Sequence, residues 1–278
     1  HRDLHSFPTR RSSDLNVILT FNATDGLNLA IKGLLKPGDH VITTSMEHNS
    51  VLRPIMELQK NGVENTVVQC EKDGKIKISD IETAIKGNTK LIVTTHVSNL
   101  TGTIFPIEDI GMLCKRYQIP YLVDAAQSAG VLEIDVKKSN ISFLAVPGHK
   151  GLLGPQGTGA LLINSDLTIN HLKEGGTGSE SSNLYQPDFY PDKFEAGTPN
   201  LPGIAGLNEG LKYIKNKGIK SIYSHEKKLL DLFITEIKKN PKIQIYGPES
   251  INDRCGVVPI NIDNVDSSEV AYILDTKY

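Results

Sequence analysis

A single lysine lies in a segment dense in glycine and proline, Pro147-Gly148-His149-Lys150-Gly151-Leu152-Leu153-Gly154-Pro155-Gln156-Gly157-Thr158-Gly159. Glycine and proline at this density build tight loops with special backbone conformations. Apolar runs typical of strands lie on both sides, at Phe143–Val146 and Ala160–Ile163. The segment is neither a Walker loop nor a Rossmann fingerprint, because the required glycine spacing and the strand–loop–helix order are absent. Lys150 is therefore a candidate functional group held in a constrained loop.

Outward from this loop, short β-branched runs alternate with amphipathic helical stretches. The expected strands are Val17–Phe21, His40–Thr43, Thr66–Cys70, Leu91–Thr95, Tyr121–Val123, Phe143–Val146 and Ala160–Ile163. The expected helices are Asp25–Leu35, Val51–Lys60, Ser79–Lys86, Ile107–Tyr117 and a short one near Ser128. Such alternation requires crossover connections, so it predicts an α/β fold with a mainly parallel seven-stranded sheet and helices on both faces.

After Pro202 the pattern changes to that of a second, smaller unit. The expected elements are helices at Gly203–Lys217 and Ile222–Lys239, strands near Ile243–Ile245 and Gly256–Ile262, and a final helix from Ser267. We therefore expect a large domain over residues 16–221 and the start of a truncated α+β domain over residues 222–278. The region 174–200 between strands and helices has no clear period, and a loop of that length usually serves function or an interface.

Both ends of the chain indicate a fragment. Residues 1–15 show no helical or strand period, and Ser6–Leu15 resembles the translation of a short sequencing adapter. We expect residues 1–15 to be a non-native scar and exclude them from the fold. At the other end the chain stops at Tyr278, directly after a helix-like segment and without a capping glycine.

Composition and charge exclude several classes of function. Hydrophobic residues make up 38% and charged residues 22% of the chain, so it can bury a core. The net charge of −2 provides no basic excess for nucleic acid or an anionic membrane, and no apolar run approaches the roughly 20 residues of a membrane span. Three cysteines without a CxxC pair argue against disulfides or a zinc site. We expect a cytoplasmic enzyme without a metal.

Polar side chains follow the expected strands at the end where ligands of open α/β sheets bind. One strand leads into a helix N-terminus at Ala23 and Thr24, where free amides and the helix dipole suit a phosphate. Two further strands are followed by Asn99 and by Asp124, and His48 follows a fourth. Taken singly, each is also explained by the fold, as a helix cap or a structural histidine.

Together these residues match the needs of pyridoxal 5′-phosphate (PLP). That cofactor requires a lysine for a Schiff base, a carboxylate at its pyridine nitrogen, a ring on its face and an anion site for its phosphate. Lys150, Asp124, His48 and the helix start at Thr24 all fall at one edge of the expected sheet. The combination predicts a PLP-dependent enzyme more strongly than any single residue does.

The chain from Asn16 to Tyr278 resembles the class V aminotransferases and, within them, the cysteine desulfurases and selenocysteine lyases. The resemblance implies the fold type I architecture of PLP-dependent transferases, with a large domain and a small domain. The matching segments are Asn22-Ala23-Thr24-Asp25-Gly26-Leu27-Asn28, Met46-Glu47-His48-Asn49-Ser50, His96-Val97-Ser98-Asn99-Leu100-Thr101-Gly102, Asp124-Ala125-Ala126-Gln127-Ser128, Gly148-His149-Lys150 and Phe194-Glu195-Ala196-Gly197-Thr198-Pro199-Asn200.

The resemblance implies a role for each site residue. Lys150 would hold the cofactor as a Schiff base and later move the substrate's Cα proton, and His48 would stack on the ring. The remaining contacts implied are Ala23, Thr24 and His149 at the phosphate, Asp124 at the pyridine nitrogen, and Asn99 and Gln127 at the 3′-oxygen. Pro147 stands where many relatives have a phosphate-binding serine, and it cannot donate a hydrogen bond. Gly176, in the Gly175–Gly178 loop, would reach the cofactor of a partner subunit, which implies a homodimer.

The implied activity is removal of sulfur from L-cysteine, giving L-alanine and an enzyme persulfide, with a sulfur-acceptor protein as a further partner. Selenocysteine lyase activity on L-selenocysteine, another class V reaction such as transamination or epimerisation, and a non-catalytic scaffold are the alternatives. The family's acceptor cysteine lies in an Arg-x-Gly-x-His-Cys type segment, a context that Cys70, Cys114 and Cys255 all lack. We interpret the three as structural and expect the fragment to be inactive as it stands.

Overall fold

The computed structural model of the chain describes residues 11–12, 15–164, 166–180 and 182–278. The proposed non-native segment 1–15 therefore lies mostly outside the described residues. Its described part contributes to the sheet, because Arg11 and Ser12 pair with Asn16 and Leu15.

Eight strands form one sheet in the order β1-β2-β8-β7-β6-β5-β3-β4. They are β1 (Arg11–Ser12), β2 (Leu15–Thr20), β3 (His40–Thr44), β4 (Glu64–Val68), β5 (Thr89–Thr95), β6 (Tyr121–Asp124), β7 (Phe143–Pro147) and β8 (Gly159–Ile163). Strands β7, β6, β5, β3 and β4 are mutually parallel, whereas β8, β2 and β1 pair antiparallel. The expected mainly parallel sheet of seven strands is confirmed, and β1 adds two residues at its edge.

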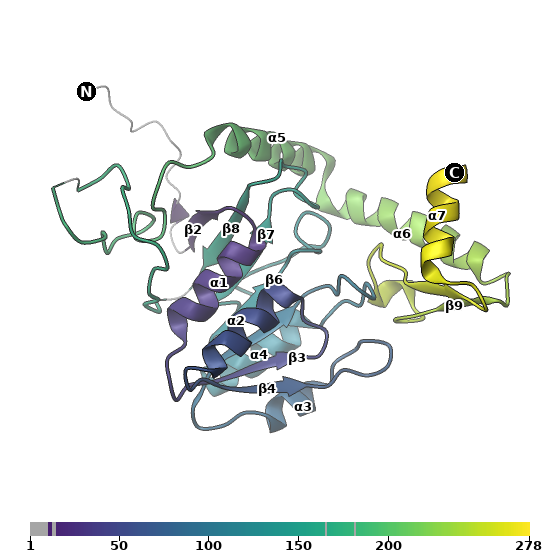
Figure 1. Cartoon of the computed structure of the whole chain (residues 1–278), viewed down its shortest axis with the longest axis horizontal. Helices are drawn as coiled ribbons and strands as arrows, with labels where there is room; N and C mark the ends of the chain where they lie inside the picture. Colours follow the sequence, from purple (N-terminus) through teal and green to yellow (C-terminus); the bar gives the residue numbers. More distant parts are fainter. Residues whose placement is uncertain (1–10, 13–14, 165, 181) are drawn as a thin grey trace.

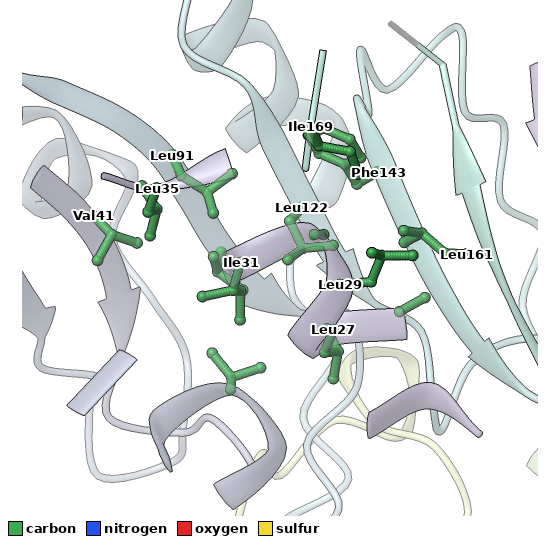
Figure 2. Close-up of a cluster of buried hydrophobic side chains, with 14 of the residues drawn as sticks. Leu27, Leu29, Ile31, Leu35, Val41, Leu91, Leu122, Phe143, Leu161 and Ile169 are labelled. Atoms are coloured by element: carbon green, nitrogen blue, oxygen red, sulfur yellow. The ribbon is translucent and has the colours of Figure 1, made fainter. Parts of the chain in front are cut away.

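Helices cover both faces of this sheet. Those packed on the faces are α1 (Ala23–Leu34), α2 (Asn49–Gln59), α3 (Ile78–Thr83) and α4 (Ile107–Tyr117). Helices α5 (Leu201–Lys217), α6 (Ile219–Ile237) and α7 (Ser267–Lys277) follow later in the chain. Successive strand residues alternate between the faces. Leu91 and Val93 pack in one core cluster with α1 and α2, while Ile92 packs in the other with α3 and α4. Figure 2 shows the cluster around α1, where Leu27 and Ile31 meet strand residues such as Leu122.

The remaining elements lie towards the ends of the molecule. Strands β9 (Ile243–Ile245) and β10 (Ile260–Ile262) form an antiparallel pair, and a short 3₁₀ helix, Ile251–Asp253, lies between them in sequence. Figure 1 places β9 and α7 at one end of the molecule and the loops leading into α5 at the other. Among the described residues between β8 and α5 there is no helix or strand, as the sequence predicts.

Some expected elements differ from the structure. The short helix near Ser128 is wrong: the chain makes only turns there, because Gly130 adopts a left-handed conformation with φ of 85° that interrupts a right-handed helix. Cys70 lies just beyond β4 rather than in it, since β4 pairs with β3 only as far as Val68. The expected strand Gly256–Ile262 is shortened to β10, which starts after Pro259. Proline lacks the N–H that a paired strand needs.

No helix in the part of the chain that the structure describes is long and apolar enough to cross a membrane.

Replacing Ile31 with alanine should lower the free energy of unfolding by about 2–5 kcal/mol, because the side chain is fully buried between α1 and the sheet. Urea unfolding measures this. Lys32→Ala, at the exposed neighbouring position of the same helix, is the control and should change stability by less than about 0.5 kcal/mol. Equal losses in the two variants would contradict the packing of this face.

Candidate active site

A cavity of about 230 Å³ lies at the carboxyl ends of the parallel strands. Its walls come from α1, from the start of α2 and from the ends of β5, β6 and β7. Eight of the nine site residues predicted from the sequence line it, namely Ala23, Thr24, His48, Asn99, Asp124, Gln127, His149 and Lys150. The sequence separates these residues by more than a hundred positions, and the sheet brings them to one place.

The first residues of α1 form one wall. Asn22 is the N-cap, and its side chain accepts a hydrogen bond from the Asp25 amide at 2.9 Å. Neither Thr24 nor Asp25 is the cap, although the Asp25 carboxylate accepts the Phe21 amide at 3.1 Å. Amides in the first turn of a helix have no partner within that helix and attract anions. Ala23 and Thr24 therefore present an anion site to the cavity.

His48 is fixed by a short hydrogen-bonded chain. It is the N-cap of α2, and its Nδ1 accepts the Ser50 amide at 3.1 Å. Because Nδ1 accepts that proton, a neutral His48 ring carries its own proton on Nε2. The Ser50 hydroxyl lies 2.8 Å from Nδ1 and 2.7 Å from Thr24 Oγ1. Ser50 thus links the imidazole on α2 to the anion site on α1, so His48 is both a helix cap and a cavity residue.

Asp124 is the buried carboxylate of the site. Its side chain is 3% exposed, and Oδ1 accepts the Ala126 amide at 2.9 Å. Burial raises the pKa of Asp124, while the Ala126 hydrogen bond and the charges of Lys150 and His48 oppose that rise. The carboxylate therefore sits where a cationic group would relieve its desolvation.

Close backbone contacts hold the loop that carries Lys150. A Cβ at Gly148 would lie 2.0 Å from Thr158 Oγ1, and one at Gly151 would lie 2.4 Å from the Ala129 carbonyl oxygen. Only glycine fits at such approaches. The Gly151 contact presses the lysine loop against the segment that follows Asp124, and this fixes where Lys150 begins.

Asn99 belongs to a tight loop after β5. An isolated bridge pairs Val97 with Ile104, and Gly102 donates its amide to the Ser98 carbonyl at 3.0 Å. The Ser98 hydroxyl accepts the amides of Leu100 and Thr101, both at 3.2 Å. These bonds hold Asn99 at the cavity without a helix or strand of its own.

Gly176 is the predicted site residue that the cavity of this chain does not include. It is exposed, and its carbonyl accepts the Gly197 amide at 2.8 Å. A second cavity, of about 670 Å³, shares Val97, Gln127 and Lys150 with the first and extends along α6 to Cys255. In the described part of the chain, no group of three or more His, Cys, Asp or Glu side chains could hold a metal ion.

Three polar residues that line the cavity, Asn22, Ser50 and Thr95, were not predicted as site residues from the sequence. Ser50 connects Thr24 to His48. The sequence feature that could have identified Ser50 is its position two residues after a histidine at the start of a helix. Thr95 is the last residue of a buried strand, and nothing in its local sequence marks it.

The model of the family described as aminotransferase class-V matches residues 10–277. The chain belongs to the class V aminotransferases. Class V relatives include a probable cysteine desulfurase of Pyrococcus abyssi, 39% identical over 93% of this chain, and a cysteine desulfurase of Wigglesworthia glossinidia brevipalpis, 35% identical over 96%. The chain spans 66% of the length of each of these two relatives.

A solved structure supports the same family membership. The apo structure of a cysteine desulfurase from Thermococcus onnurineus NA1 aligns with a TM-score of 0.88 and 37% identity. The alignment covers 93% of this chain and 66% of that one. The α/β fold predicted from strand–helix alternation and the class V family that the six motifs resemble are both confirmed.

Asp124→Asn should stabilise the cofactor-free chain near pH 7. The raised pKa means that folded Asp124 binds its proton more tightly than the unfolded chain does. Stability is therefore lost as the pH rises above about 4, and asparagine, which still accepts the Ala126 amide, does not undergo this loss. In urea unfolding, the free energy of unfolding of Asp124→Asn should exceed that of the wild type by more near pH 7 than near pH 4.

Asp231→Asn, an exposed change on α6, is the control and should show no such difference from the wild type. If the wild type were as stable as Asp124→Asn at both pH values, burial of the Asp124 carboxylate would not lower stability and the prediction would be wrong.

Proposed function

We propose that this chain binds PLP in the 230 Å³ cavity and that the whole protein removes sulfur from L-cysteine, giving L-alanine and an enzyme persulfide. One observation carries the proposal. A buried carboxylate, a lysine, an imidazole and the N-terminus of a helix line one cavity in a class V aminotransferase. The names of the relatives support the choice of reaction.

The donor set of the cavity fits PLP. Ala23 and Thr24 would hold the phosphate through their amides, with His149 beside them. Pro147 lines the same cavity and offers neither an amide proton nor a hydroxyl, so phosphate binding depends more on α1. Asp124 would face the pyridine nitrogen, whose positive charge would offset the desolvation of the carboxylate.

The remaining site residues would orient the ring and move the proton. The bound cofactor supplies an electron sink for negative charge at the substrate Cα. Lys150 Nζ would carry the cofactor covalently and then take the proton from Cα. His48, held by Ser50, would lie against the ring face, and Asn99 and Gln127 would hold the 3′-oxygen.

Sulfur transfer would need a thiol that the chain does not present. Burial raises the pKa of Cys114 and of Cys255 to about 12, so neither forms a thiolate readily near neutral pH. Burial also raises the pKa of the half-buried Cys70. Because the chain spans 66% of its relatives, we place the acceptor cysteine in the part of the protein beyond these residues.

The proposal extends to assembly and organisation. Residues 16–221 would form the PLP-binding domain and residues 222–278 would begin the small domain. Gly218, where α5 ends and α6 starts, lies close to this proposed boundary. The exposed Gly176 loop would meet the cofactor of a second copy in a homodimer. We also propose that the whole protein passes sulfur to an acceptor protein and that it is cytoplasmic.

Lys150→Ala should abolish covalent retention of PLP. Wild-type protein incubated with PLP and reduced with borohydride should gain the mass of one cofactor, whereas the variant should gain none, because no other lysine among the described residues lines the cavity. Intact-protein mass spectrometry measures this. Lys173→Ala removes an exposed lysine outside the cavity and should label as wild type does. Full labelling of Lys150→Ala would overturn the assignment.

The chain of residues 1–278 loaded with PLP should release no sulfide from L-cysteine, because its three thiols all have raised pKa values. A colorimetric sulfide assay with added dithiothreitol measures this. Turnover that disappears in Cys255→Ser would instead identify Cys255, which shares a cavity with Lys150, as the acceptor.

A further inference from the structure

Glu47 is a buried carboxyl group just behind the cavity wall. It lies in the turn between β3 and α2, directly before His48, and is 7% exposed. The Thr44 hydroxyl donates to its Oε1 at 2.6 Å. Its Oε2 is buried and has no hydrogen-bond partner among the described residues.

Among the residues that the structure describes, none with a positive charge acts on the ionisation of Glu47. Its side chain comes within electrostatic reach of Asp124 and Tyr121 on β6 and of Cys70 beyond β4, and each of these is neutral or negative. The Thr95 amide and the Thr44 hydroxyl are the groups that favour its charged form. Thr95 pairs in register with Asp124, so the strand residue whose amide favours the charged form of Glu47 is the β-sheet partner of Asp124.

Two buried carboxylates within electrostatic reach repel each other, so the ionisation of one raises the pKa of the other. The charges of Lys150 and His48 favour the ionised form of Asp124. Burial raises the pKa of Glu47 to about 8, and the charge of Asp124 adds to the rise. Near neutral pH the proton therefore belongs on Glu47.

We propose that Glu47 is a positioning residue that stays protonated at neutral pH and so adds no second negative charge beside Asp124. Its neutral acid fills the space beside Thr95 without adding a second charge near the pyridine nitrogen. The link to the cofactor rests on the proposed function, whereas the protonation of Glu47 does not.

The first test measures the proton directly in cofactor-free protein. Infrared spectroscopy of the wild type near neutral pH should show a carboxylic-acid C=O band that is lost in Glu47→Gln, persists in Asp124→Asn, and disappears as the pH is raised through about 8. Glu57→Gln, an exposed change on α2, should leave the band unchanged. The proposal would be overturned if the wild type and Glu47→Gln gave the same spectrum in the region of the carboxylic-acid C=O band.

The second test asks whether Glu47 acts on Asp124. A double-mutant cycle of Glu47→Gln and Asp124→Asn should be additive in unfolding free energy near pH 6, where Glu47 is neutral. Near pH 9.5 it should be non-additive, because both carboxylates are then charged in the wild type and either change alone relieves the repulsion. Coupling that does not change with pH would indicate a packing role alone and overturn the proposal.

The third test uses the cofactor. Glu47→Gln should bind PLP within about twofold of the wild type near pH 7, because glutamine is the neutral isostere, and Glu47→Ala should bind less tightly because it empties a buried site. A loss of tenfold or more in Glu47→Gln would show that a charged Glu47 is required. Failure of the wild type to bind PLP would instead refute the proposed function and leave the infrared and stability results to decide the state of Glu47.

Discussion

The desolvation of Asp124 is the constraint around which the site is built. Its carboxylate ends a central parallel strand, is almost fully buried, and accepts a hydrogen bond from the Ala126 amide. An anion in that position is unfavourable unless positive charge faces it, and Lys150 and His48 supply part of that charge. Burial of Asp124 lowers the stability of the folded chain. It also leaves in the cavity a carboxylate that interacts strongly with a cationic group.

Two features of the backbone bring Asp124 and Lys150 to the same cavity. Parallel strands end at one edge of the sheet, so β5 and β6 deliver Asn99 and Asp124 to the same cavity. The lysine loop then packs against the turns after Asp124, with Gly151 and Gly130 in backbone contact that a Cβ at either position would prevent. The position of Lys150 relative to Asp124 is therefore set by backbone sterics rather than by an ion pair.

Unfavourable electrostatics in the site are offset elsewhere in the sheet. The two core clusters bury apolar side chains of α1 and α2 on one face and of α3 and α4 on the other. Such burial is the main favourable contribution to folding. With that support, two carboxyl groups, Asp124 and Glu47, remain buried at one edge of the sheet. Ser50 adds order by linking Thr24, in the first turn of α1, to His48, the N-cap of α2.

The sequence by itself determined the class of fold and most members of the site. Strand–helix alternation is a local pattern, and Thr24, His48, Asn99, Asp124 and Lys150 lie in motifs that can be read along the chain. The helix expected near Ser128 failed because Gly130 is placed by contact with Gly151, which lies far away in sequence. The linking role of Ser50 and the burial of Glu47 were decided only by the tertiary structure, since hydrogen-bond partners and desolvation depend on which strands and helices become neighbours.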